Sequence, residues 1–132
     1  MRQIALIVED DPATCHVLAS TLASAGIESL FAESAAVMWQ QMAESPDVVI
    51  LDLGLPDADG FELLRRLRQQ SDVPVLIHST RSEEIERIIG IEIGADDFLP
   101  KPCNMRELLA RVRSLLRRAK GRPSLMGGRP GC

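Results

Sequence analysis

Two short, uninterrupted apolar segments constrain the fold of this 132-residue chain more than any other feature. They are residues 4–8 (IALIV) and residues 48–51 (VVIL), and acidic residues follow each of them directly. A strand with one solvent-exposed face alternates polar and apolar residues, whereas a continuously apolar strand is typically buried on both faces. We therefore predict two central strands of a parallel sheet, each with carboxylates at its carboxyl end.

Helix and strand patterns alternate along the rest of the chain. Asp11 and Pro12 suit the N-cap and first position of a helix, and Gly26 suits its stop. Further strands are predicted at 29–32, 74–79 and 97–99, and further helices at 35–42, 61–68, 83–93 and 105–118. Alternating elements with short connections give a parallel sheet with helices on both faces. The predicted fold class is an α/β, doubly wound (βα)5 sandwich.

Charge is unevenly distributed along the chain. Residues 1–100 hold 6 Lys and Arg against 18 Asp and Glu, whereas residues 101–132 hold 9 against 1. A basic end can bind nucleic acid, but these basic residues fall largely on one predicted helix that can pair with the acidic body. We expect the basic helix to pair with the acidic body, and we expect no appreciable DNA binding by this chain itself.

The length and a hydrophobic content of 45% fit a single domain, which we place at residues 1–120. Residues 121–132 are rich in Gly, Pro and Arg and are predicted to be a linker or a disordered tail. The three cysteines have neither the even count of a disulfide framework nor metal-site spacing, which suggests a reducing compartment. No apolar run approaches the roughly 20 residues that cross a bilayer, so we expect a cytoplasmic protein without membrane contact.

Acidic residues follow the two apolar strands, at what would be one edge of the sheet. Glu9 and Asp10 follow the first strand and Asp52 follows the third. Carboxylates brought together raise one another's pKa and need a cation to stay ionised. Oxygen ligands of high charge suit Mg²⁺, so the sequence predicts a magnesium site. Asp11, by contrast, is interpreted mainly as the helix cap.

Two further residues near the same edge point to phosphoryl transfer. Ser79 ends the fourth predicted strand, and Lys101 lies just past the fifth. Their hydroxyl and ammonium groups can hold the oxygens of a transferring phosphoryl group, with Asp52 as the nucleophile. Alone, Ser79 would be an ordinary loop hydroxyl and Lys101 a solvated charge. Their joint position at strand ends favours the functional interpretation.

Longer motifs support a family resemblance. They are VEDD at 8–11, LDLGLPDADGFELL at 51–64, GADDFLPKP at 94–102 and NMRELLARVRSLLRR at 104–118. Because of these motifs, residues 3–119 resemble the CheY-like receiver domain of two-component response regulators of the OmpR/PhoB subfamily. The resemblance implies a flavodoxin-like fold with strand order 2-1-3-4-5, Mg²⁺ as cofactor and a sensor histidine kinase as partner.

The resemblance also implies roles for individual residues, with Asp52 as the phosphoacceptor. The implied metal set is Glu9, Asp10, Asp52 and the carbonyl of Gly54, with Glu9 assisting through water. The implied phosphate contacts are Ser79, Thr80 and Lys101. The implied switch pair is Ser79 and Phe98, and the implied cis-proline is Pro102. Phe98 stands where the subfamily usually has Tyr, so the hydroxyl contact of that Tyr is absent here.

A homodimer on phosphorylation is a further implication, formed by helix 83–93, strand 97–99 and helix 105–118. At about 100° per residue, Ile85, Ile89 and Ile93 would face the core, leaving Ile88 and Ile91 exposed. Matching charges surround Ala110: Arg87 with Glu107, Asp97 with Arg111, and Glu92 with Arg113. The alternative is intramolecular or solvated pairs, each contributing about 0–1 kcal/mol.

Other functions on this fold fit less well. A haloacid dehalogenase-type hydrolase needs a second Asp two residues after its nucleophile, and Gly54 occupies that place. A flavin carrier needs a hydroxyl-rich phosphate loop where this chain has acids. We predict a phosphoacceptor switch and not an enzyme, controlling a DNA-binding output domain that is not in this chain. A stand-alone receiver in a phosphorelay is the alternative.

His78 adjoins Ser79 and invites interpretation as a base. Successive strand residues point to opposite faces, so His78 should face away from the side of Ser79. We expect His78 to be a packed or rim residue rather than a catalytic one.

Overall fold

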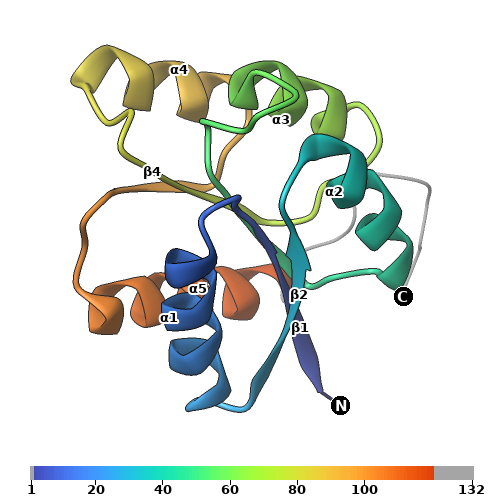
Figure 1. Cartoon of the computed structure of the whole chain (residues 1–132), viewed down its shortest axis with the longest axis vertical. Helices are drawn as coiled ribbons and strands as arrows, with labels where there is room; N and C mark the ends of the chain where they lie inside the picture. The colour runs from blue at the N-terminus through green and yellow to red at the C-terminus, as the bar shows by residue number, and fades with distance from the viewer. Residues whose placement is uncertain (1, 121–132) are drawn as a thin grey trace.

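A computed structural model describes residues 2–120 of the protein; residue 1 and the predicted tail at 121–132 lie outside the described residues. Strands and helices alternate from one end to the other (Figure 1). The strands are β1 (Gln3–Val8), β2 (Ile27–Ala32), β3 (Val48–Leu51), β4 (Val75–Ser79) and β5 (Asp97–Pro100). The helices are α1 (Pro12–Ala23), α2 (Ala35–Gln41), α3 (Gly60–Arg68), α4 (Glu84–Ile93) and α5 (Met105–Lys120), with a short 3-10 helix η1 (Met42–Glu44) after α2.

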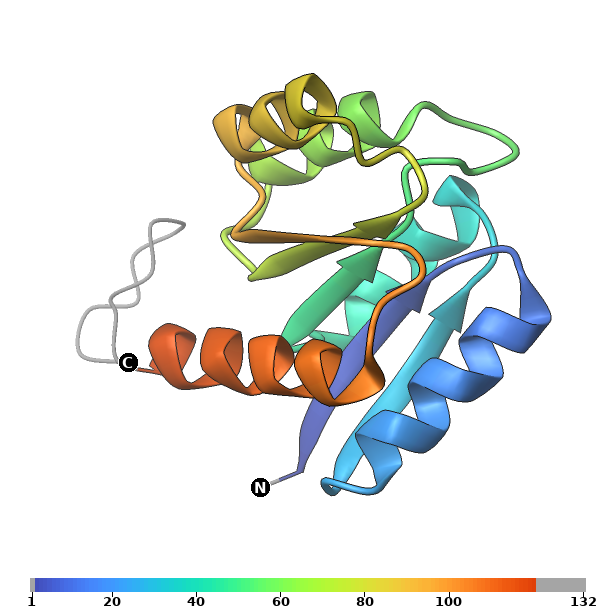
Figure 2. The same cartoon turned by 90° about the vertical axis from the view of Figure 1, so that its left-hand side faces the viewer.

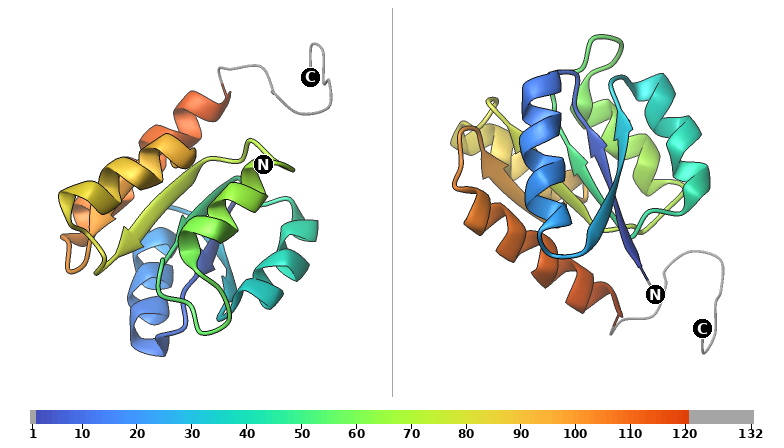
Figure 3. Two further views of the ribbon diagram at one scale, coloured as in Figure 1. Left: turned by 90° about the horizontal axis from the view of Figure 1, so that it is seen from above. Right: turned by 60° about the horizontal axis from the view of Figure 1, so that its bottom comes forward.

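The strands form one parallel sheet in the order β2-β1-β3-β4-β5. Helices α1 and α5 cover one face, and α2, α3 and α4 cover the other (Figure 2). The right-hand view of Figure 3 looks onto the face that carries α1 and α5. The predicted fold class and strand order are therefore confirmed.

The apolar strands divide their side chains between two cores. In β1, Leu6 and Val8 pack in the core beneath α2 and α3, whereas Ala5 and Ile7 pack in the core beneath α1 and α5. All four side chains are fully buried. Burial of a side chain the size of Leu or Ile stabilises a fold by about 1.5–3 kcal/mol, so neither face of the buried part of β1, residues 5–8, tolerates a polar residue. This is why those residues are apolar without interruption, whereas the polar residue of the strand, Gln3, lies at its partly exposed start.

Helix α1 begins as predicted. The carboxylate of Asp11 accepts hydrogen bonds from the backbone N–H of Thr14 at 3.0 Å and from its hydroxyl at 2.6 Å, and Pro12 occupies the first position. The hydrogen bonds to Thr14 lower the pKa of Asp11. The start of α1 is thereby fixed immediately after the acidic end of β1.

Two details differ from the sequence prediction. Strand β2 starts at Ile27, two residues earlier than predicted, because Ile27 pairs in parallel register with Gln3. The assignment of Ile85 to the core is wrong, since its side chain is 60% exposed. Gly90 is the buried residue of α4 and lies beside Ile77 and Phe98, whereas Ile85 lies in the first turn, more than one turn from that contact.

Candidate functional site

Three carboxylates meet where β1 and β3 end. One oxygen each from Glu9, Asp10 and Asp52 can be chosen so that all lie within 4.8 Å of one another. β1 and β3 are neighbours in the sheet, with Val8 beside Leu51, so the residues that follow them are placed side by side. Glu9 and Asp52 are buried, whereas Asp10 is exposed. The donor set is oxygen-only and highly charged, which suits a hard divalent cation such as Mg²⁺.

Lys101 closes this cluster from the end of β5. Its Nζ lies 2.5 Å from Oε1 of Glu9 and 3.5 Å from Oδ2 of Asp52. The other oxygen of Glu9 accepts a hydrogen bond from the backbone N–H of Asp11 at 3.1 Å. Lys101 is itself anchored, because its backbone N–H donates to the carbonyl of Ser79 at 2.9 Å. The ammonium is thus held between the two buried carboxylates.

The buried charges perturb one another. Burial raises the pKa of Glu9, and the charge of Asp52 adds to the increase, although the hydrogen bond from Lys101 opposes it. Burial acts to lower the pKa of Lys101, but the hydrogen bond to Glu9 and the negative charge of Asp52 outweigh it, so the net direction is upward. Lys101 is therefore a cation at neutral pH, and the excess negative charge of the cluster remains for another cation to balance.

Hydroxyl groups lie at the end of the neighbouring strand. Ser79 is buried, and its Oγ accepts a hydrogen bond from the backbone N–H of Arg81 at 3.1 Å, which leaves the hydroxyl hydrogen able to donate. Thr80 is exposed beside it. Phe98 is buried on β5, with its ring in the core beneath α3 and α4. The sheet brings these residues to the same edge as the carboxylates.

Two loop residues complete the predicted set. Gly54 is exposed, and a Cβ added there would lie 3.9 Å from Oδ2 of Asp52, so the backbone of this loop runs beside the carboxylate. The peptide bond between Lys101 and Pro102 is cis. The structure thus gathers the predicted metal and phosphate-contact residues at one edge of the sheet.

Arg81 holds together the loops that border the site, although no motif in the sequence marks it. Its Nε lies 2.8 Å from Oε2 of Glu86, and its Nη1 lies 3.2 Å from Oδ1 of Asp59. Its guanidinium also lies 4.9 Å from the centroid of the Phe61 ring. These contacts join the β4–α4 loop to the β3–α3 loop. No local pattern reveals them, because Arg81 and Asp59 are 22 residues apart.

Asp57 is a second residue whose side chain joins segments that are distant in the sequence. Its carboxylate accepts hydrogen bonds from the backbone N–H groups of Ala35 and Ala36, at 2.8 and 3.2 Å, and these bonds lower its pKa. The β3–α3 loop is thereby tied to the start of α2. Only the fold brings Asp57 to that helix end, 22 residues from Ala35.

The face formed by α4, β5 and α5 carries the predicted dimer residues. Ile88 and Ile91 are 43% and 46% exposed, as the helical periodicity predicts, and Ala110 is exposed on α5. Arg111 pairs within the chain, lying 3.2 Å from Asp97 and 3.0 Å from Glu107. Among the salt bridges of residues 2–120, none involves Arg87, Glu92 or Arg113.

His78 is a packed residue, as strand alternation predicts, with only 4% of its surface exposed. It follows Leu76 on the side of the sheet that α1 and α5 cover. Within the described part of the chain, no helix combines the length and the hydropathy that a bilayer crossing requires.

Comparisons with known proteins agree with this geometry. Residues 5–113 match the family model of the response regulator receiver domain. The KDP operon transcriptional regulatory protein KdpE of Escherichia coli K12 is 46% identical over 114 residues, which are 86% of this chain and 51% of KdpE. The transcriptional regulatory protein CpxR homolog of Haemophilus influenzae is 40% identical over 114 residues, 86% of this chain and 50% of that protein. The chain spans about half the length of these relatives.

Solved structures give the same assignment. The receiver domain of the TMAO respiratory system response regulator TorR superimposes with a TM-score of 0.83 at 40% identity, covering 88% of this chain and 98% of that one. The BeF3-activated receiver domain of Klebsiella pneumoniae RstA gives a TM-score of 0.83 at 32% identity, covering 87% of this chain and 99% of that one. The chain therefore belongs to the response regulator receiver domains of two-component systems, with relatives in the OmpR/PhoB subfamily.

Proposed function

We propose that the protein is a phosphorylation-controlled switch in which Asp52 accepts a phosphoryl group from a sensor histidine kinase. The observation that carries this proposal is the ammonium of Lys101 held between Glu9 and Asp52 at the carboxyl edge of the sheet. A cation already within 3.5 Å of the acceptor carboxylate needs little movement to reach a phosphoryl oxygen on it.

In the proposed transfer, a carboxylate oxygen of Asp52 attacks phosphorus. A new P–O bond forms while the bond from phosphorus to the leaving group of the donor breaks. The leaving group keeps the electron pair and takes up a proton. Lys101 and the hydroxyl of Ser79 then donate hydrogen bonds to the phosphoryl oxygens, with Thr80 at the exposed side. Their contribution is positioning and charge neutralisation, which dominate phosphoryl transfer.

The acidic cluster fits a divalent cation. Glu9, Asp10, Asp52 and the carbonyl of Gly54 would hold Mg²⁺, with Glu9 acting through water. The support is the oxygen-only donor set and a loop backbone close to Oδ2 of Asp52. The ion would supply positive charge opposite the phosphoryl oxygens. Asp10 is exposed, so this side of the cluster is open to the approaching donor.

The switch would run from Ser79 to Phe98. A Ser79 hydroxyl drawn toward the phosphoryl group frees space on the inner side of β4, and the Phe98 ring then fills it. Phe98 lies beside Gly90 of α4: a Cβ on Gly90 would be 3.6 Å from its ring. Movement of this ring therefore repacks α4 against β5. That repacking is the proposed link between the phosphorylation site and the face formed by α4, β5 and α5.

On that face we place a symmetric homodimer of the phosphorylated protein. Ile88, Ile91 and Ala110 would supply its apolar centre, because all three are exposed. Charged residues surround them, namely Arg87, Glu92, Asp97, Glu107, Arg111 and Arg113. Arg111 already holds Asp97 and Glu107 within the chain, so in the dimer it would exchange or share these partners. A two-fold axis repeats each contact, and charge complementarity selects the partner.

The switch would act through a DNA-binding output domain in a longer protein. This part of the proposal rests on relatives that are named transcriptional regulatory proteins and are about twice as long as the matched region. Residues 1–120 would be the receiver domain, and it would work in the cytoplasm. Phosphorylation would switch its conformation, and the domain would not act as an enzyme on a substrate.

The test uses acetyl phosphate and Mg²⁺ with intact mass spectrometry. The wild type should gain one phosphoryl group, and Asp52→Asn should gain none. Asp59→Asn is the matched control, since Asp59 is an exposed aspartate a few residues away whose partner is Arg81. The Asp59 variant should be phosphorylated like the wild type. Equal phosphorylation of Asp52→Asn would contradict the proposal.

A further inference from the structure

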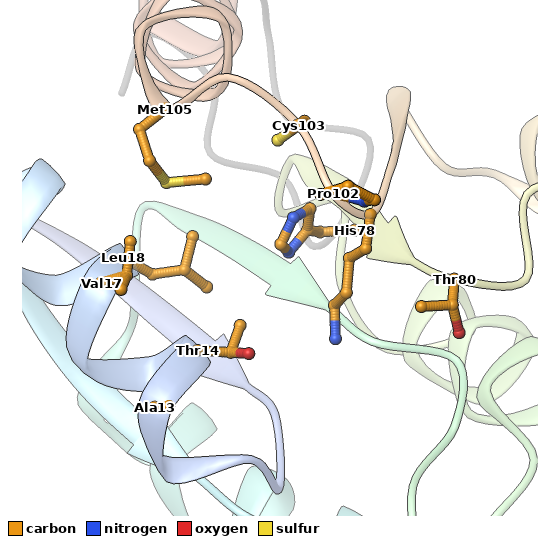
Figure 4. Close-up of a pocket in the computed structure, with 10 residues that line it drawn as sticks. Ala13, Thr14, Val17, Leu18, His78, Thr80, Pro102, Cys103 and Met105 are labelled. Carbon is orange, nitrogen blue, oxygen red and sulfur yellow. The ribbon is translucent and has the colours of Figure 1, made fainter.

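A cavity of about 430 Å³ lies on the α1 and α5 side of the sheet, apart from the three carboxylates. Its walls come from α1, the end of β4 and the segment that leads from β5 into α5 (Figure 4). Most of the lining is apolar or sulfur-containing, and the main contributors are Val17, Leu18, Pro102, Cys103 and Met105. This volume falls within the range of small-molecule sites in proteins.

One polar side chain projects into this apolar space. In Figure 4, the imidazole of His78 lies beside Pro102 and points toward the side chains of Leu18 on α1 and Met105 at the start of α5. His78 is 4% exposed, and its Nδ1 has no hydrogen-bond partner among the described residues. Buried polar groups in proteins are nearly always paired, so the imidazole at this cavity wall keeps hydrogen-bonding capacity that the described residues leave unused at Nδ1.

The charge state of the cavity limits what that partner is. Burial lowers the pKa of His78 to about 4, with the charge of Lys101 contributing, so the imidazole is neutral at neutral pH. Lys101 also lines the cavity, but its ammonium is paired with Glu9 and Asp52. Neither an anion nor a cation would find an uncompensated charge here. An uncharged ligand is therefore favoured.

We propose that this cavity binds a small, uncharged aromatic alcohol or phenol, whose ring packs against Leu18 and Met105 and whose hydroxyl hydrogen-bonds to His78. A neutral imidazole offers one acceptor and one donor nitrogen, and a hydroxyl can satisfy either of them. The apolar ring would replace water along the aliphatic and sulfur-containing walls.

Occupancy of the cavity would be coupled to phosphorylation, a consequence that rests on the proposed function. Lys101 and Thr80 line the cavity, and both are proposed phosphate contacts. A ligand that packs against the stem of Lys101 restrains the residue that must turn toward the phosphoryl group. By linkage, phosphorylation would change ligand affinity by the same factor by which the ligand changes the phosphorylation equilibrium.

The test compares phenol with toluene, which differ in the hydroxyl, by amide NMR titration of the unphosphorylated protein. Both should shift signals of residues at the cavity saturably, with phenol binding about five- to tenfold more tightly, as expected for one buried hydrogen bond. In His78→Phe the two affinities should become equal. His16→Phe, which alters the exposed histidine of α1, should keep the preference for phenol. Equal affinities in the wild type, or no saturable shifts at the cavity, would overturn the proposal.

A second readout needs no variant, in case His78→Phe fails to fold. The ring ¹⁵N signals of His78 should shift with phenol and not with toluene, while those of His16 stay unchanged. Unchanged His78 ring signals at saturating phenol would exclude the hydrogen bond. Failure of the proposed function can be distinguished from failure of this proposal. A protein that binds phenol in this cavity but is never phosphorylated would support the binding site and contradict the proposed phosphorylation switch.

Discussion

The ammonium of Lys101 lies 2.5 Å from a carboxylate oxygen of Glu9, although 92 residues separate them in the chain. The parallel sheet creates this contact by bringing the ends of β1 and β5 to the same edge. Glu9 is 3% exposed, so the pair is largely removed from water. Breaking a buried pair leaves an uncompensated charge, and this makes Lys101 the first residue to test.

Replacing Lys101 by alanine should separate metal binding from switching. The carboxylates remain, so Mg²⁺ should still bind, but the phosphoryl oxygens lose a charge-assisted hydrogen bond. We expect the response of the Phe98 amide signal to beryllofluoride to need at least about tenfold more reagent, the equivalent of about 1.4 kcal/mol. Lys120→Ala, an exposed lysine at the end of α5, is the control. An undiminished response in Lys101→Ala would exclude this role.

His78 should make the stability of the protein depend on pH. Its pKa is about 4 in the folded state against an ordinary value of 6.5, so between these pH values the unfolded chain binds more protons. Stability should therefore fall as pH decreases through this window, by about 3 kcal/mol in total from this residue. Urea unfolding at several pH values measures it. His78→Phe should lose this component and His16→Phe should retain it; identical pH dependence in both variants would contradict the assignment.

Two glycines should differ in their tolerance of alanine. A Cβ on Gly60 would lie 2.5 Å from the backbone Cα of Leu53, whereas a Cβ on Gly90 would lie 2.8 Å from the terminal methyl of Ile77, which can move. Gly60→Ala should cost about 1–3 kcal/mol through overpacking. Gly90→Ala should cost less, because alanine in a helix interior gains about 1 kcal/mol over glycine. Chemical denaturation gives both values, and the reverse order would show that the backbone near Leu53 relaxes.

The proposed dimer should form only on activation. Sedimentation velocity with beryllofluoride should detect dimers of the wild type and monomers of Ile88→Glu and Arg87→Glu. Val17→Glu places the same charge at an exposed apolar residue on α1, across the sheet from α4, and should still dimerise. A wild type that stays monomeric with beryllofluoride, or dimers that tolerate the Ile88 and Arg87 changes, would contradict the proposed face.

Local patterns predicted the central strands and the helix cap at Asp11, and the family resemblance predicted the strand order. The start of β2 could not be predicted in this way, because Ile27 is in the strand only through its pairing with Gln3. The exposure of Ile85 depends on where α4 touches the sheet, which periodicity alone does not give. Likewise, the contacts of Arg81 and Asp57 join segments 22 residues apart. Local patterns predicted elements and strand ends, and long-range packing determined the rest.

The most direct test of the central claim identifies the residue that carries the phosphoryl group. Aspartyl phosphate is reduced by borohydride to homoserine, whereas an unmodified aspartate is not. After treatment with acetyl phosphate and Mg²⁺, reduction and digestion, tandem mass spectrometry of the peptide that contains residues 48–60 should find homoserine at position 52. Homoserine at Asp10, Asp57 or Asp59 instead, or aspartate at every position in a protein whose intact mass shows phosphorylation, would contradict the assignment of Asp52 as the phosphoacceptor.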